Sequence, residues 1–162
     1  MKIGVFEEIK ISLFKPKQYY KLKNISILRL LGFYIIVALI SVVFTVASNF
    51  FIALFSKNIL GFYRYLGTFF TLKNFTISFS YMVVGLFLSS IVISLLLIAI
   101  NRFKKINGIK FRDIVNYATH SLLICAIFSR FVGAFVILFA LGFCLIAVGA
   151  KNTILKEKAY IK

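Results

Sequence analysis

Four residues in the second half of the chain are of types that can move protons or hold ions. Asp113, Asn116, Tyr117 and His120 stand at positions i, i+3, i+4 and i+7, and in a helix this spacing places all four on one face. An ionisable side chain inside a membrane is costly, so it is the first candidate for a functional group. Histidine is also the side chain that titrates near neutral pH. We take these four residues as the candidate functional polar stripe.

The stripe has two interpretations. In the structural one, Asn116 and His120 hydrogen-bond to neighbouring helices, as polar side chains in membrane bundles do for about 0.6 to 2 kcal/mol. In the other, they face a cavity open to the cytoplasm and carry a proton, an ion or a small ligand. Ile124 and Ile127 follow on the same face, so the stripe stops partway where a transport path would continue. This favours the structural interpretation, and whether His120 is functional stays open.

Other catalytic or metal-binding patterns are absent from the sequence. One histidine and two separated cysteines do not make a zinc site, and on antiparallel helices Cys125 and Cys144 would differ in depth by about 13 Å, too far for a disulfide. The sequence contains no Ser-Lys or Ser-His dyad, paired membrane aspartates or HExxH motif. We predict no catalytic, cofactor-binding or metal-binding residues, no cofactor, and a protein that is not an enzyme.

The composition indicates a membrane protein. Of 162 residues, 62% are hydrophobic, against about 45 to 50% in soluble domains. The formal charge of +16 would point to nucleic acid in a soluble protein. Here, however, the basic residues flank apolar runs, where anionic headgroups attract them by about 1 kcal/mol each. We therefore expect the bilayer, with anionic headgroups at its cytoplasmic face, as the partner, and no nucleic acid.

The apolar runs predict the elements that position the stripe. We expect an all-α integral membrane four-helix bundle, a single transmembrane domain over residues 1–162. Spans at about 30–54 and 75–100 are uncharged and long enough for the roughly 30 Å hydrocarbon core. Between them we expect a short aromatic loop, Lys57–Asn74, at the outer interface.

The third apolar region is too long for one straight span. It covers 37 residues from Ile114 to Ala150, interrupted only by Arg130. We predict a hairpin of spans at about 114–129 and 131–150 that turns at Arg130 and Gly133. A kinked or re-entrant segment around Arg130 is the alternative, and the sequence leaves it open.

Charge counting gives the orientation. With four spans, the N-terminal segment, the loop after the second span and the tail share one side, which then carries 16 of the 20 basic residues. The positive-inside rule makes that side cytoplasmic. We predict a multi-pass protein of the plasma membrane, bacterial in type, with cytoplasmic N- and C-termini.

A short amphipathic helix is predicted before the first span, at about residues 2–15. Its apolar face would consist of Val5, Phe6, Ile9 and Leu13. Charged residues would point away from that face: Glu7, Glu8 and Lys15. We expect this helix to lie on the inner leaflet of the membrane.

Two stretches resemble known families. Residues 12–29, SLFKPKQYYKLKNISILR, resemble the start of a bacterial polytopic membrane family of unknown function found near maltodextrin-utilisation genes. Residues 109–121, IKFRDIVNYATHS, look like the related Yip family of membrane trafficking proteins. The chain departs from both in lacking a proline after the Tyr-Ala segment and in its expected number of spans. The resemblance implies an accessory, scaffold or trafficking-like role.

Two functional hypotheses follow. The first is a small non-enzymatic membrane protein that acts through helix packing with a membrane protein partner or with itself. The alternative is a small channel or transporter with a polar, cytoplasm-open cavity around Asn116 and His120. Neither the partner, the substrate nor the oligomeric state can be inferred from the sequence.

Overall fold

The computed structural model describes residues 4–22, 25–104, 109–132 and 135–160. Every element in these ranges is a helix, as the sequence predicts. The elements, in chain order, are α1 (Val5–Phe14), the 3-10 helix η1 (Pro16–Leu22), α2 (Ile27–Phe55), α3 (Ile59–Phe69), α4 (Leu72–Phe103), α5 (Phe111–Val132) and α6 (Val136–Tyr160).

Three helical segments are long and apolar enough to cross a membrane: Leu28–Phe55, Leu72–Phe103 and Val136–Ile154. The first two contain the predicted spans at 30–54 and 75–100. Both helices begin at a side chain that accepts a hydrogen bond from an exposed backbone N–H group, Ser26 in α2 and Thr71 in α4. These segments support a multi-pass helical membrane protein.

The expected loop between the first two spans is wrong, because most of it is helix α3. Asn58 caps this helix, its Oδ1 accepting from the Gly61 backbone N–H at 3.0 Å. The aromatic rings are spaced for a helix and contact one another, with Tyr65 and Phe69 stacked at 5.4 Å between centroids. Lys57 takes the left-handed conformation, with φ of 54°, and so allows the chain to reverse after α2.

Helices α5 and α6 form an antiparallel hairpin. We expected the chain to turn at Arg130, and it does not. Helix α5 continues through Arg130 to Val132, and the predicted turn residue Gly133 lies outside the described residues. Side-chain contacts give the register, since Asp113 pairs with Lys151 and Ser121 with Cys144. These pairs are symmetric about a point near residue 132, which lies between the two predicted turn residues.

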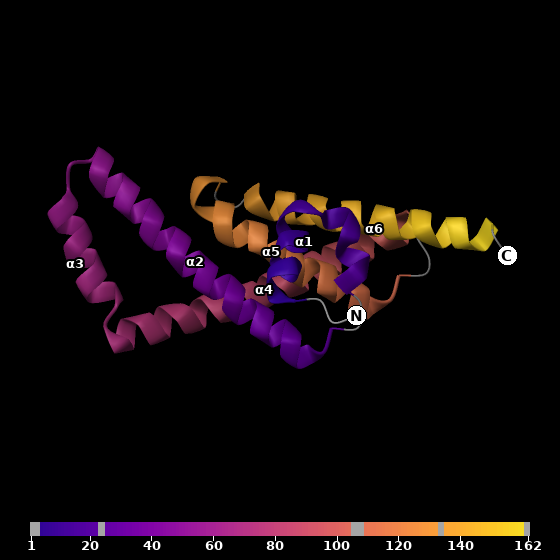
Figure 1. Ribbon diagram of the computed structural model, residues 1–162, viewed down its shortest axis with the longest axis horizontal. Helices are drawn as coiled ribbons and strands as arrows, with labels where there is room; N and C mark the ends of the chain where they lie inside the picture. Colours follow the sequence, from indigo (N-terminus) through magenta and orange to yellow (C-terminus); the bar gives the residue numbers. More distant parts are fainter. Residues whose placement is uncertain (1–3, 23–24, 105–108, 133–134, 161–162) are drawn as a thin grey trace.

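The molecule has a packed body and a projecting part, which we call the outer arm. Figure 1 shows α2 and α4 diverging beyond the α5–α6 hairpin, with α3 joining their far ends. The outer arm consists of residues 43–55 of α2, α3, and residues 72–89 of α4. Exposure agrees with this division, because the buried residues of α4 begin at Ser90 and α3 has no buried residue among those described.

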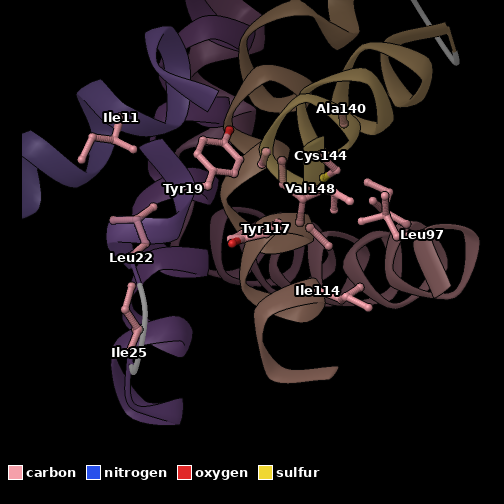
Figure 2. Packing of buried hydrophobic residues seen from close by; sticks show 14 of the residues in the cluster. Ile11, Tyr19, Leu22, Ile25, Leu97, Ile114, Tyr117, Ala140, Cys144 and Val148 are labelled. Atoms are coloured by element: carbon pink, nitrogen blue, oxygen red, sulfur yellow. The ribbon is translucent and has the colours of Figure 1, made fainter. Parts of the chain in front are cut away.

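Helix α5 lies at the centre of the body and packs against α1, α2, α4 and α6, while η1 packs against α6. In Figure 1, α1 and the chain that follows it cross the middle of α5 and α6. The largest buried cluster contains Ile11, Tyr19 and Leu22 from this N-terminal part. Figure 2 shows Tyr19 close to Tyr117 and the α6 residues Cys144 and Val148. The N-terminal segment is therefore part of the core.

Helix α1 (Val5–Phe14) falls within the predicted helix at about 2–15, of which residues 2 and 3 lie outside the described residues, but the predicted orientation of its faces is wrong. Its buried residues are Glu8, Ile11 and Ser12, whereas Phe6 is 90% exposed. Glu8, which we expected to point away from the apolar face, is 2% exposed. The cause is a polar partner inside the body, which the apolar pattern of α1 alone could not reveal.

Candidate functional site

The buried partner of Glu8 is His120, on the face of α5 that α1 covers. His120 is fully buried, and its Nε2 lies 2.9 Å from Oε1 of Glu8. Its Nδ1 lies 2.7 Å from the backbone carbonyl oxygen of Asn116. The ring of Phe33 from α2 packs against the imidazole, with centroids 4.4 Å apart. Three elements thus hold the imidazole in one orientation.

The hydrogen-bond inventory determines how many protons this pair holds. A carbonyl oxygen can only accept, so Nδ1 of His120 donates to Asn116. Nε2 faces a carboxyl oxygen of Glu8, and this contact is a hydrogen bond only if one proton lies in it. The proton belongs either to an imidazolium facing a carboxylate or to a carboxyl facing a neutral imidazole, so both forms keep the pair neutral overall.

Arg29, in the first turn of α2, completes the cluster. Its Nε and terminal nitrogen donate to Oε2 of Glu8 at 3.0 and 2.7 Å. Burial raises the pKa of Glu8, but the hydrogen bonds and charges of His120 and Arg29 together outweigh it and leave the pKa below its ordinary value. Glu8 therefore lies between the imidazole of His120 and the guanidinium of Arg29, with one carboxyl oxygen facing each. We call Glu8, Arg29 and His120 the ionic cluster.

Local bonds fix the shape of the N-terminal segment that delivers Glu8. The Ser12 hydroxyl donates to the backbone carbonyl of Glu8 at 2.7 Å. The Tyr19 hydroxyl donates to the carbonyl of Ser12 at 2.7 Å and so ties η1 back to α1. Pro16, at the first position of η1, fits the break between the two helices because it has no N–H to place. The segment docks as a preformed hairpin.

The other residues of the predicted stripe also contact neighbouring elements. The Asn116 amide donates to the carbonyl of Leu22 at the end of η1. Asp113 forms an ion pair with Lys151 of α6, whose side chain is 8% exposed. Tyr117 is buried beside Tyr19, with ring centroids 5.9 Å apart. The stripe therefore lies on one face, as predicted, but each member has a different neighbour.

Some polar atoms of the stripe have no partner within the described residues. These are Oδ1 of Asn116 and the Tyr117 hydroxyl, and at the end of α4 both side-chain polar atoms of Asn101. Buried polar groups are usually satisfied by protein or by water. These atoms are the places where ordered water would fit best.

A second polar junction joins three long helices. The Tyr34 hydroxyl of α2 lies 2.7 Å from Ser90 Oγ of α4 and 2.9 Å from Thr119 Oγ1 of α5. Thr119 stands next to His120 in sequence, and both contact α2, Thr119 through Tyr34 and His120 through Phe33. The junction fixes the rotation of α2 and α4 against α5.

Two side chains of the ionic cluster are buried, His120 at 0% and Glu8 at 3% exposure. Hollows of about 480, 390 and 350 Å³ lie elsewhere on the described surface, and none of these three is lined by a stripe residue. Cys125 and Cys144 are free thiols. Over the described ranges, no group of three or more His, Cys, Asp or Glu side chains is close enough to hold a metal ion. The arrangement holds helices together and presents no open site at His120.

Comparison with known protein families, curated proteins and solved structures finds no match for this chain. The resemblances drawn from residues 12–29 and 109–121 therefore stay expectations. The same stretches have a clear structural role here, since they supply η1 and the first half of α5, which bond to each other.

Proposed function

We propose that this chain is a non-enzymatic membrane protein that acts as an accessory or scaffold component, through helix packing with another membrane protein. The main support is that polar groups of the stripe are already hydrogen-bonded within the chain. The stripe that could have lined a transport path is bonded to the chain's own N-terminal segment, through Leu22 and Glu8. Large apolar side chains stay exposed on the described helices and are available for packing.

We propose further that the chain spans the membrane with both termini in the cytoplasm. The hairpin register supports an even number of crossings. Because α5 and α6 are antiparallel, α6 returns to the side of the membrane on which α5 begins. The C-terminal end then lies on the side where α4 ends, whether the hairpin crosses the whole bilayer or turns back within it. Its basic residues therefore stay with the larger positive set, as the positive-inside rule requires. The four-span arrangement is our preferred form of this topology.

The outer arm is the best candidate for the contact with a partner. Its helices diverge beyond the body (Figure 1), so long stretches of α2 and α4 lack neighbours from the described chain. Large apolar side chains there are exposed, among them Val43 at 64%, Phe51 at 57% and Val84 at 54%. A transmembrane helix of another protein, or of a second copy, would pack against these exposed side chains of α2 and α4 and gain van der Waals contacts.

Photo-cross-linking in the native membrane tests this proposal. A benzophenone amino acid replaces Val43 or Val84 in the arm, and Leu138, which is 63% exposed on α6, as a matched control in the body. We expect discrete protein adducts from the two arm positions and lipid adducts from Leu138. An adduct of twice the chain mass would identify a second copy as the partner. Lipid adducts alone at all three positions would refute the proposal.

The channel or transporter hypothesis makes a different prediction. It needs the N-terminal segment to leave α5, so that Asn116 and His120 open to the cytoplasm, and the unpartnered Asn116 Oδ1 and Tyr117 hydroxyl are the atoms that favour it. A transport activity in liposomes that His120→Ala abolishes, with the protein level unchanged, would support this hypothesis over the scaffold. Activity that survives the substitution would place transport away from the stripe.

A further inference from the structure

Residues of α1 line two hollows of opposite character. The first is an apolar groove of about 480 Å³ between α1, α5 and α6. Its walls include Leu13 and Phe14 of α1, Ile127 and Phe128 of α5, and Phe139 and Phe143 of α6. All of these side chains are apolar, and Phe128 and Phe139 lie close to the end of the hairpin. The groove therefore has the character of a site for a hydrocarbon chain.

The second hollow is basic. It measures about 350 Å³ and lies between α1 and the start of η1, where it is lined by Lys10, Lys15, Gln18 and Glu7 together with two apolar residues. Both lysines are exposed. Glu7 offsets one of the two positive charges, so the recess keeps an excess of one positive charge, with the Gln18 amide as a further donor.

The linings of the two hollows meet in the sequence at the end of α1. Phe14 borders the groove and the next residue, Lys15, borders the recess, while Lys10 lies one helical turn before Phe14. A cationic side chain at the mouth of an apolar groove complements a molecule with an anionic head and a hydrocarbon tail. We propose that groove and recess together bind one anionic phospholipid, with an acyl chain in the groove and the phosphate on Lys10 and Lys15.

This site is independent of the proposed partner contact, because it lies on the body and uses no residue of the outer arm. It also differs from the general attraction of basic segments to an acidic membrane surface. That attraction acts on any exposed lysine near the headgroups, whereas the site binds a single lipid and depends on two particular lysines and on the groove beside them.

Tryptophan quenching by brominated lipids tests the proposal. The chain has no tryptophan of its own, so Phe139→Trp places a single probe in the groove. A matched probe, Leu95→Trp, sits on α4 at a position 59% exposed. Each purified variant is reconstituted in unlabelled phosphatidylcholine containing a small fraction of either brominated phosphatidylglycerol or brominated phosphatidylcholine. Circular dichroism verifies that the helices are intact.

We expect the groove probe to be quenched more strongly by phosphatidylglycerol, with a relative binding constant about threefold or more above that of phosphatidylcholine. The Leu95→Trp probe should show a ratio of about one. Adding Lys10→Gln and Lys15→Gln to Phe139→Trp should bring its ratio to about one, whereas Lys57→Gln and Lys73→Gln at the far end of the molecule should leave it unchanged. Soluble glycerol phosphate, which has no acyl chain, should not displace the lipid.

Three results would overturn the proposal. Equal quenching of the Phe139→Trp probe by both lipids would show that the groove does not select an anionic lipid. Selectivity that survives the loss of Lys10 and Lys15 would place the headgroup elsewhere. Displacement by glycerol phosphate would likewise contradict a site that needs the groove.

Discussion

The ionic cluster predicts that two neighbouring glutamates differ widely in how much they stabilise the fold. Glu7 and Glu8 are adjacent, but Glu7 is exposed while Glu8 is buried against His120 and Arg29. We expect Glu8→Ala to destabilise the protein strongly and Glu7→Ala to have almost no effect. The comparison holds helix position, charge change and side-chain size constant, so burial and bonding are the variables that differ.

The magnitude follows from what Glu8→Ala leaves behind. Removing one partner of a buried ion pair costs about 3 to 5 kcal/mol, mostly because the other charge stays buried and unpaired. The Arg29 side chain is 33% exposed and can turn to water, which reduces its share of the cost. His120 is 0% exposed and loses its partner at Nε2 without replacement. We therefore expect the lower end of the range, about 3 kcal/mol.

The assay is equilibrium unfolding in mixed micelles, followed by circular dichroism as the fraction of denaturing detergent increases. Amide hydrogen exchange adds a local measurement. Undocking of α1 should speed exchange across Val5–Phe14 by about a hundredfold in Glu8→Ala, and Glu7→Ala should exchange like the unmodified protein. A difference in unfolding free energy between the two variants below about 0.5 kcal/mol would refute the reasoning, since surface substitutions alone vary by that much.

Three further predictions use the same assays. The pKa of Glu8 is lowered from 4.5 in the folded state, so its contribution to the unfolding free energy should be complete above pH 4.5 and lost as the pH falls through the lower folded value. Glu8→Gln should remove this pH dependence. The same dependence of the unfolding free energy on pH in both proteins would contradict the prediction. Lys151→Ala should lower the unfolding free energy by about 3 kcal/mol, because Asp113 loses its ion-pair partner. Lys104→Ala, at an exposed position, should lower it by under about 0.5 kcal/mol. Equal losses in the two variants would refute a role for the pair. Tyr34→Phe should lower the unfolding free energy by about 1 to 2 kcal/mol, because the hydrogen bonds to Ser90 and Thr119 are lost. Tyr81→Phe, at an exposed position, should change it by no more than about 0.5 kcal/mol. If neither substitution changed the unfolding free energy, the junction would not have its proposed role.

The sequence predicts the long helices well because their signal is one of composition. Leu28–Phe55 and Leu72–Phe103 are uninterrupted apolar runs between charged residues, and the membrane thickness sets their length. The hairpin was also predictable, since 37 apolar residues with one charge cannot form a single span. Its turn was misplaced because we took Arg130 as a breaker, although arginine is a good helix former and the helix continues through it.

The candidate site was predictable only in part, for a physical reason. The stripe Asp113, Asn116, Tyr117 and His120 could be found because its members lie within two turns of one helix. Its most important partner, Glu8, is 112 positions from His120, and nothing local distinguishes Glu8 from Glu7. Helix α3 was missed for a different reason, because glycines at 61 and 67 outweighed the helical spacing of its aromatic residues in our reading.

The long separation between Glu8 and His120 has a consequence for biosynthesis. The ribosome completes α1, η1 and α2 well before it reaches α5, so Glu8 and Arg29 can pair while the imidazole does not yet exist. Helix α1 is therefore synthesised before α5, but it can take its final place only after the hairpin of α5 and α6 has been inserted. During that interval its apolar residues Ile11 and Leu13 are uncovered, which makes this nascent chain a natural client for chaperones and for membrane insertases.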